Sequence, residues 1–129
     1  MSDEQGVRRT LALYCQLCDD GRFDEWAELF TEGARFTVMG GTHAGRDNVK
    51  AWIEAAQPPE RRGKHFLGQS VVDFEPDGLT ATGVTDYTFV SKRSEGYVIT
   101  SAGRYHDTLH RGDDGRWRFD SREIRFLGD

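Results

Sequence analysis

Three side chains, two near the start of the sequence and one at its middle, could together transfer protons without a metal ion. Tyr14 and Asp19 lie five positions apart in a segment typical of an amphipathic helix, and His65 begins a segment typical of a strand. A carboxylate that holds one imidazole nitrogen leaves the other nitrogen free to act as a base near neutral pH. A phenol beside this pair could donate a hydrogen bond, or a proton, to a substrate oxygen. These residue types predict acid–base chemistry, provided that the fold brings them together.

Each of the three residues also has a purely structural interpretation. His65 could be a core histidine whose nitrogens are both hydrogen-bonded, Tyr14 an aromatic residue that only packs in the core, and Asp19 a solvated acid at the end of a helix. An acid is slightly unfavourable at a helix C-terminus, where the helix dipole is negative. A carboxylate in that place therefore suggests a specific partner, which could be His65 or an arginine.

Periodicity predicts helices first and long strands afterwards. A capping box at Ser2 and apolar residues at helical spacing predict a first helix over residues 3–18. A second, short helix would carry Phe23, Trp26, Leu29 and Phe30 on one side. After a short strand at 34–39, a third helix starts near Gly45 and stops at Pro58-Pro59. Turn-forming residues then separate four strand-like runs, at 64–75, 79–93, 96–110 and 115–127. This order predicts an α+β fold, a cone in which a curved, mostly antiparallel sheet wraps around the helices.

The composition limits the function classes. The chain has 129 residues, 36% hydrophobic and 30% charged, which suits one globular domain over residues 1–129. A net charge of −5 argues against a nucleic-acid partner, and the basic segment 61–64 is interpreted as a solvated loop. No apolar run approaches the ~20 residues that span a membrane, and the N-terminus does not look like a signal peptide. We therefore expect a cytoplasmic protein that has no membrane partner.

No motif calls for a metal or a cofactor. Cys15 and Cys18 would lie at i and i+3 of a helix, without a second cysteine pair or a nearby histidine to complete a zinc site, so we interpret them as core-facing residues. Asp86, Arg104 and Asp107 could supply an acid–arginine–acid arrangement around a water, as epoxide hydrolysis would need. Asp107 could equally belong to an outward-facing charged ladder. Arg122 could point into a pocket or brace the sheet edge.

Together these segments resemble the SnoaL-like branch of the nuclear transport factor 2-like superfamily. The resemblance covers nearly the whole chain and depends on the order and spacing of its pieces rather than on any one of them. It implies a cone of helices against a strongly curved sheet, and a homodimer or homotrimer. The pieces are Tyr14-x4-Asp19-x-Gly21-x-Phe23-x2-Trp26-x2-Leu29-Phe30, Gly45-Arg46, Lys64-His65, Gly103-Arg104-Tyr105-x-Asp107 and Asp114-Gly115-Arg116-Trp117-Arg118-Phe119-x2-Arg122.

The site layout is similar to those of scytalone dehydratase, hexachlorocyclohexane dehydrochlorinase and bile-acid dehydratase. In these enzymes a histidine paired with an aspartate removes a proton beside the leaving group, and His65 and Asp19 fall on those positions. Tyr14 matches a tyrosine of the bile-acid enzyme, and Arg122 falls near a pocket arginine of the dehydrochlorinase. Many relatives carry asparagine where this chain has Gln69.

The resemblance thus implies a cofactor-free lyase or isomerase that acts on a small hydrophobic, cyclic molecule. We expect the apolar wall of its pocket to be formed by Trp26, Phe30, Met39, Trp52, Leu67 and Tyr105. The superfamily also contains non-catalytic members, namely polyketide-pathway binding proteins and the small subunits of ring-hydroxylating dioxygenases. A non-catalytic protein that binds a hydrophobic ligand or helps an assembly is therefore the alternative, because a shared fold does not decide function.

Overall fold

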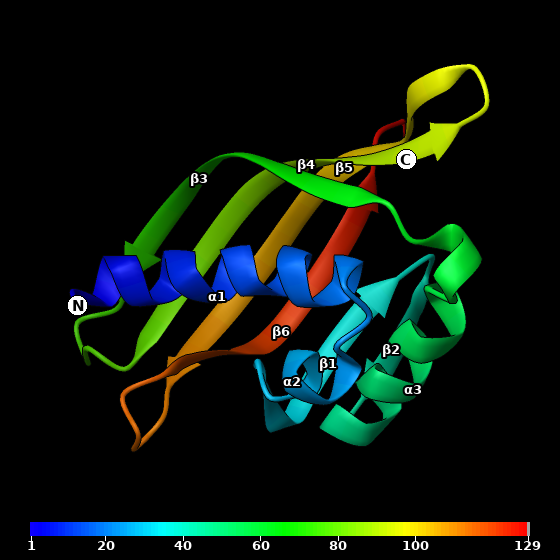
Figure 1. Cartoon of the computed structure of the whole chain (residues 1–129). Coiled ribbons are helices and arrows are strands. Elements are labelled where there is room, and N and C mark those ends of the chain that lie inside the picture. Colours follow the sequence, from blue (N-terminus) through cyan, green and yellow to red (C-terminus); the bar gives the residue numbers. More distant parts are fainter. Residues whose placement is uncertain (129) are drawn as a thin grey trace.

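The computed structural model describes residues 1–128, which form helices packed against one sheet (Figure 1). In chain order the elements are α1 (Asp3–Asp19), α2 (Phe23–Ala27), β1 (Phe30–Val38), β2 (Gly41–Ala44), α3 (Arg46–Ala56), the 3-10 turn η1 (Pro59–Arg61), β3 (Lys64–Phe74), β4 (Thr80–Arg93), β5 (Gly96–Arg111) and β6 (Trp117–Phe126).

The sheet has six strands in the order β2-β1-β6-β5-β4-β3. Neighbouring strands are antiparallel except β1 and β6, which run parallel. The predicted α+β fold and the predicted meander of four long strands are confirmed. The sheet is curved but open, because its two edge strands, β2 and β3, do not pair with each other (Figure 1).

One boundary and one whole strand in the first half differ from the prediction. Leu29 and Phe30 do not extend α2, because the Leu29 carbonyl accepts a hydrogen bond from the Phe119 backbone N–H at 2.8 Å and Phe30 already pairs with Phe119 in the sheet. The strand β2 was not predicted at all. Its four residues, Gly41–Ala44, are mostly exposed and carry no alternating apolar pattern that could have revealed it.

The first helix forms for the reasons that the sequence suggests. The Ser2 hydroxyl accepts a hydrogen bond from the Gln5 N–H, and the Gln5 side chain accepts one from the Ser2 N–H, so the predicted capping box is confirmed. One stripe of the helix is buried against the concave side of the sheet, and it includes Leu11, Tyr14 and Cys18. The helix ends at Asp19, just before Gly21, which has a φ of 71° that favours glycine.

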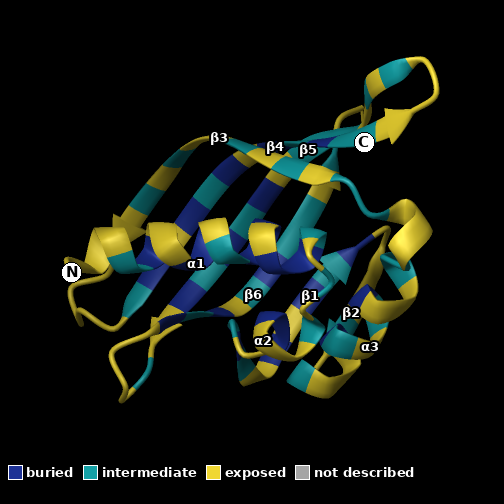
Figure 2. Ribbon diagram, viewed as in Figure 1, coloured by how far each residue is buried: buried dark blue, intermediate teal, exposed yellow. Residues whose placement is uncertain are grey.

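The core lies between α1 and the sheet and is rich in aromatic residues. Figure 2 shows the buried residues as alternating bands along the central strands that α1 crosses. In β4 every second residue from Ala81 to Phe89 is buried, as expected for a strand with one covered face. A register shift in β3 between Leu67 and Ser70, around Gly68, bends this edge strand. No helix within residues 1–128 is long and apolar enough to cross a membrane.

Candidate active site

The last residue of α1 meets the second residue of β3. Asp19 Oδ1 lies 2.6 Å from His65 Nδ1, and Asp19 Oδ2 accepts a hydrogen bond of 3.0 Å from the His65 backbone N–H. The two side chains are 4% and 10% exposed, respectively. Because a carboxylate only accepts hydrogen bonds, Nδ1 carries the proton of this contact and the lone pair of the imidazole lies on Nε2. Nε2 makes no hydrogen bond to any residue of the described chain.

Aromatic rings surround the imidazole. The ring centre of His65 lies 4.6 Å from that of Phe89 and 6.4 Å from that of Tyr87. The ring of Tyr14 stands edge-on to it at 6.3 Å. The structure thus brings Tyr14, Asp19 and His65 into one cluster, in which Tyr14 is buried and the carboxylate and the imidazole are partly buried.

Tyr14 is a neutral donor in this cluster. The residue is 2% exposed, and burial raises the pKa of its phenol well above the ordinary value, while the nearby positive charge of Arg122 lowers it in part. The phenol therefore keeps its proton over the whole accessible pH range. It can donate a hydrogen bond to an oxygen, but it gives up the proton reluctantly.

Arg122 is fixed inside the core rather than at the edge of the sheet. Its Nε and Nη2 donate to the two carboxylate oxygens of Asp107 at 2.7 and 2.8 Å, and both side chains are fully buried. The guanidinium carbon lies 4.1 Å from the ring centre of Tyr14 and 3.9 Å from that of Tyr105. Burial alone would lower the pKa of Arg122, but the charge and hydrogen bonds of Asp107 raise it above its ordinary value. The arginine is therefore a permanent cation beside Tyr14.

The acid–arginine–acid arrangement does not form. Asp86 and Arg104 pair with each other on the exposed outer face of the sheet, at 2.6 Å between Asp86 Oδ1 and Arg104 Nε. Asp107 is three positions beyond Arg104 in the same strand and therefore faces the opposite way, into the core. The interpretation of Asp107 as part of an outward ladder is wrong, since its partner Arg122 lies opposite it on the inner face.

The predicted pocket wall divides into three parts. Trp26, Phe30 and Tyr105 are buried around Tyr14, with ring centres 5.3, 6.3 and 5.6 Å from its own, and Leu67 packs against the same core. Trp52 lies farther off. It packs on Phe36 at 4.9 Å and on His43 at 5.7 Å, so α3 holds it against β1 and β2.

Met39 does not take part in the cluster. It occupies the turn between β1 and β2, where it has a positive φ of 51° and is 75% exposed. The prediction that Met39 lines the pocket is wrong, because it continued the strand by one residue, whereas β1 ends at Val38. The β1–β2 hairpin in fact turns at Met39 and Gly40 and carries the side chain into solvent.

Three residues of the cluster were not predicted as parts of the site, namely Tyr87, Phe89 and Phe119, and Asp107 was considered only for the acid–arginine–acid arrangement. Tyr87 stacks on Tyr105 at 4.5 Å, and the Phe119 ring lies 4.2 Å from the guanidinium carbon of Arg122. A signal for the first two exists in the sequence, since Thr85, Tyr87 and Phe89 alternate along one face of β4. The placement of Asp107 depends on a cross-strand partner and has no local signal.

The cysteines are buried, as predicted. Cys15 and Cys18 are free thiols that are 5% and 1% exposed. Burial raises the pKa of Cys15 to about 12 and raises that of Cys18 as well. Both are therefore protonated and unreactive at neutral pH. Nowhere in residues 1–128 do three or more His, Cys, Asp or Glu side chains gather in a way that could hold a metal ion.

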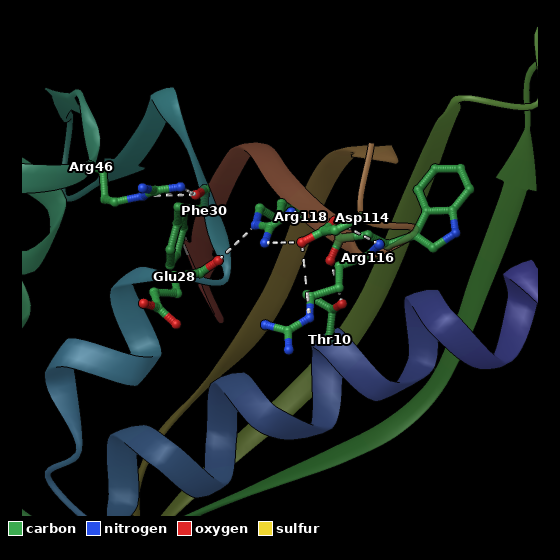
Figure 3. Close-up of polar contacts among 8 residues, drawn as sticks. Thr10, Glu28, Phe30, Arg46, Asp114, Arg116 and Arg118 are labelled. Carbon is green, nitrogen blue, oxygen red and sulfur yellow. Dashed lines mark hydrogen bonds and ion pairs between the residues drawn. The ribbon is translucent and has the colours of Figure 1, made fainter. Parts of the chain in front are cut away.

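The surface also has a cavity of about 750 Å³, which lies away from this cluster, between α1, α2 and the start of β6. Figure 3 shows how its wall is tied together: Arg118 donates to the Glu28 carbonyl at 3.0 Å and pairs with Asp114, and Arg116 lies beside them. Three further cavities, of about 530, 430 and 510 Å³, lie elsewhere on the surface. None of these four is lined by Asp19 or His65.

Comparison with known proteins places the fold. The model of the SnoaL-like domain family matches residues 1–123. A protein of unknown function from Mycobacterium tuberculosis, solved as an Asp-to-Asn variant, is 27% identical over 96% of this chain and 71% of its own, with a TM-score of 0.88. An NTF2-like protein with a cystatin-like fold from Novosphingobium aromaticivorans is 28% identical over 98% of this chain and 82% of its own, with a TM-score of 0.86.

A more distant neighbour is described as a candidate scytalone dehydratase, also from Novosphingobium aromaticivorans. It is 23% identical over 97% of this chain and 84% of its own, with a TM-score of 0.83, and shows likeness of fold alone. No curated protein matches the sequence significantly. The comparisons therefore establish the family and the architecture, and the chemistry has to be argued from the residues.

Proposed function

Since the chain belongs to the SnoaL-like domain family, we propose that it is a cofactor-free lyase or isomerase of the dehydratase type, in which His65 is the general base. The substrate is a small hydrophobic, cyclic molecule that enters the aromatic cluster. The observation that carries this proposal is the partly buried contact of 2.6 Å between Asp19 and His65 Nδ1, which leaves Nε2 without a partner in the described chain.

The reaction begins at Nε2 of His65. This nitrogen takes a proton from a carbon of the substrate, and the electron pair of the broken C–H bond forms a double bond as the leaving group departs from the neighbouring carbon. Asp19 holds the imidazole in place and stabilises the positive charge that it acquires. General base catalysis of this kind contributes about 10²–10⁴-fold, so positioning of the substrate must supply the rest.

Tyr14 and Arg122 act on the oxygen side of the substrate. Because burial raises the pKa of Tyr14, the phenol donates a hydrogen bond to a carbonyl or a leaving hydroxyl and does not transfer its proton. The proton that a departing hydroxyl needs comes from the imidazolium of His65, so that the reaction as a whole loses water and regenerates the base. The fixed charge of Arg122 offsets negative charge that develops near Tyr14.

The alternative is a non-catalytic protein that binds a hydrophobic ligand in the same place. One observation favours it, namely that none of the four cavities is lined by the Asp19–His65 pair. Both functions place a hydrophobic molecule in the cluster, and only turnover separates them.

The deciding experiment compares conversion and binding in three variants. Small cyclic β-hydroxy ketones are screened for loss of water, and active compounds are tested with His65→Ala, Asp19→Asn and the exposed-histidine control His110→Ala. We expect His65→Ala to lose at least 100-fold in conversion with the fold intact by circular dichroism, and His110→Ala to match the wild type. If the wild type converts nothing while both site variants still bind the hydrophobic compounds, the non-catalytic function holds.

The protein is further proposed to act as a homodimer or homotrimer that assembles through the outer face of the sheet. Phe66 and Val71 of β3 are 56% and 63% exposed and point away from α1, on the face opposite the cluster. Exposed apolar residues on a sheet face suit contact with a second copy. Light scattering after gel filtration measures the mass, and a monomer at micromolar concentration would contradict the assembly.

A further inference from the structure

Two buried N–H groups of the aromatic cluster have no hydrogen-bond partner among residues 1–128. They are Trp26 Nε1 and Arg122 Nη1, and their residues are 0% and 1% exposed. Buried donors in native proteins are almost always paired, because an unpaired donor forfeits its hydrogen bonds to water and gains nothing in return. Two such groups in one small core point to a hydrogen-bond acceptor that binds there.

Both donors belong to residues that touch Tyr14. The Trp26 ring centre lies 5.3 Å from that of Tyr14, and the guanidinium carbon of Arg122 lies 4.1 Å from it. Nη1 is the one nitrogen of the guanidinium that Asp107 does not hold, since Asp107 takes Nε and Nη2. Tyr14 in turn stands against His65. The residues that carry the unpartnered donors therefore belong to the same cluster as the Asp19–His65 pair, and both are linked to His65 through Tyr14.

The chemistry of these groups selects the acceptor. Indole and guanidinium are donors only, and the neutral phenol of Tyr14 adds a third donor, an O–H group. An oxygen that accepts hydrogen bonds and carries no proton of its own, such as a ketone oxygen, can be satisfied by such a set. A hydroxyl oxygen would bring a proton of its own, for which the phenol oxygen of Tyr14 is the one acceptor among these three groups, so the set suits a ketone better.

We propose that the aromatic cluster is a binding site for a carbonyl-type oxygen, and that the indole N–H of Trp26 is a specificity-determining donor to it. The proposal that this oxygen belongs to the substrate rests on the proposed function. Removal of a proton next to a carbonyl moves negative charge onto the carbonyl oxygen, and the donors of the cluster would stabilise that charge. As a statement about binding it stands without catalysis. Trp26 therefore has a role beyond the apolar wall.

The test uses three bicyclic probes that differ only at one position: 1-indanone, 1-indanol and indane. Equilibrium dialysis measures their affinity for the full-length protein. We expect 1-indanone to bind about tenfold more tightly than indane, the effect of about one to two good hydrogen bonds, and more tightly than 1-indanol. Trp26→Phe, which keeps a ring and removes the N–H, should lower that preference several-fold. Trp52→Phe, in which the altered ring lies outside the cluster, should leave it unchanged.

A second readout does not depend on the variant folding. The chain has three tryptophans, and so gives three indole N–H signals in a 15N-labelled sample. Titration of the wild type with 1-indanone should shift the Trp26 signal downfield as its hydrogen bond forms, and move the Trp117 signal, whose N–H already donates to Asp3 at 3.1 Å, much less.

Equal affinity for 1-indanone and indane, or no binding of 1-indanone, would overturn the proposal. So would an unmoved Trp26 signal at saturation, which would mean that water satisfies the two donors. His65→Ala separates the oxygen-binding site from the proposed catalytic function, because the imidazole of His65 is not one of the donors to the oxygen. If this variant and the wild type share the preference for 1-indanone and neither shows turnover, the oxygen site stands and the catalytic function fails.

Discussion

Two Asp–Arg pairs on opposite faces of the sheet form a matched test of what burial does to an ion pair. Asp107 and Arg122 are joined by hydrogen bonds of 2.7 and 2.8 Å, and both side chains are 0% exposed. Asp86 and Arg104 are joined by bonds of 2.6 and 3.3 Å, and their side chains are 59% and 54% exposed. The chemistry is the same, the geometry is similar, and only the surroundings differ.

Replacing Asp107 with asparagine should destabilise the protein severely. The change keeps the shape of the side chain but leaves the charge of Arg122 buried without compensation, which typically costs about 3–5 kcal/mol. Domains of this size are stable by about 5–15 kcal/mol, so the loss is a large share of the total. With a urea slope of about 1–3 kcal/mol per molar, the unfolding midpoint falls by at least about 1 M. Asp86→Asn should leave the midpoint nearly unchanged, because water screens the exposed pair.

Urea titration followed by circular dichroism measures both variants under the same conditions. A double variant, Asp107→Leu with Arg122→Met, removes both charges and should recover part of the stability that Asp107→Asn loses, since no unpaired charge remains in the core. Equal destabilisation by Asp86→Asn and Asp107→Asn would refute the reasoning. So would a double variant that is less stable than Asp107→Asn alone.

Two further predictions concern the frame of the site. Burial raises the pKa of Cys15 to about 12 and raises that of Cys18, so both thiols should resist Ellman's reagent at pH 8 in the native protein and react fully in urea. The free energy of unfolding should also fall as the pH rises above about 9, because only the thiols of the unfolded chain lose their protons there. Rapid reaction of the native protein would contradict the burial. Gly63→Ala should lower the urea midpoint far more than Gly68→Ala. A Cβ at Gly63 would overlap the Val90 carbonyl oxygen, whereas a Cβ at Gly68 would meet its nearest atoms at an ordinary distance of 3.6 Å. Similar unfolding midpoints for the two variants would show that β3 adapts at Gly63.

Local signals were enough to predict the elements that carry the Asp19–His65 contact. The capping box at Ser2, the apolar stripe of α1 and the alternation that begins at His65 are all properties of neighbouring residues. Their boundaries fall within one or two residues of those in the structure. The contact between the end of α1 and the start of β3 was predicted from the family resemblance, because no local pattern specifies a contact between residues 46 positions apart.

The remaining features depend on pairing between distant strands. Acids in strands are usually interpreted as solvent-facing, and only the cross-strand position of Arg122 explains why Asp107 is buried. Arg122 faces inward because a register shift near Asp120 lets Phe119 and Arg122, three positions apart, lie on the same face of β6. The parallel pairing of β1 with β6 and the short strand β2 are likewise set by the partner strand. A sequence read residue by residue contains no signal for any of these.

The clearest separation of structure from chemistry at the site comes from replacing His65 with asparagine. The side-chain amide of asparagine can place an N–H close to the position of Nδ1, so the hydrogen bond to Asp19 Oδ1 can survive, and the backbone N–H that donates to Oδ2 is untouched. What His65→Asn removes is Nε2. We therefore expect it to unfold at a higher urea concentration than His65→Ala, which leaves Asp19 Oδ1 without its partner in a nearly closed site.

If Nε2 is the base, conversion of an identified substrate should fall at least 100-fold in His65→Asn even though this variant is the more stable of the two. A purely structural role for His65 makes the opposite prediction, since activity would then follow stability and His65→Asn would be more active than His65→Ala. The order of the two variants in conversion, measured beside their order in unfolding, thus tests the role of the imidazole directly. Substantial conversion by His65→Asn would exclude His65 as the base and leave the Asp19 contact as a brace between α1 and the edge strand β3.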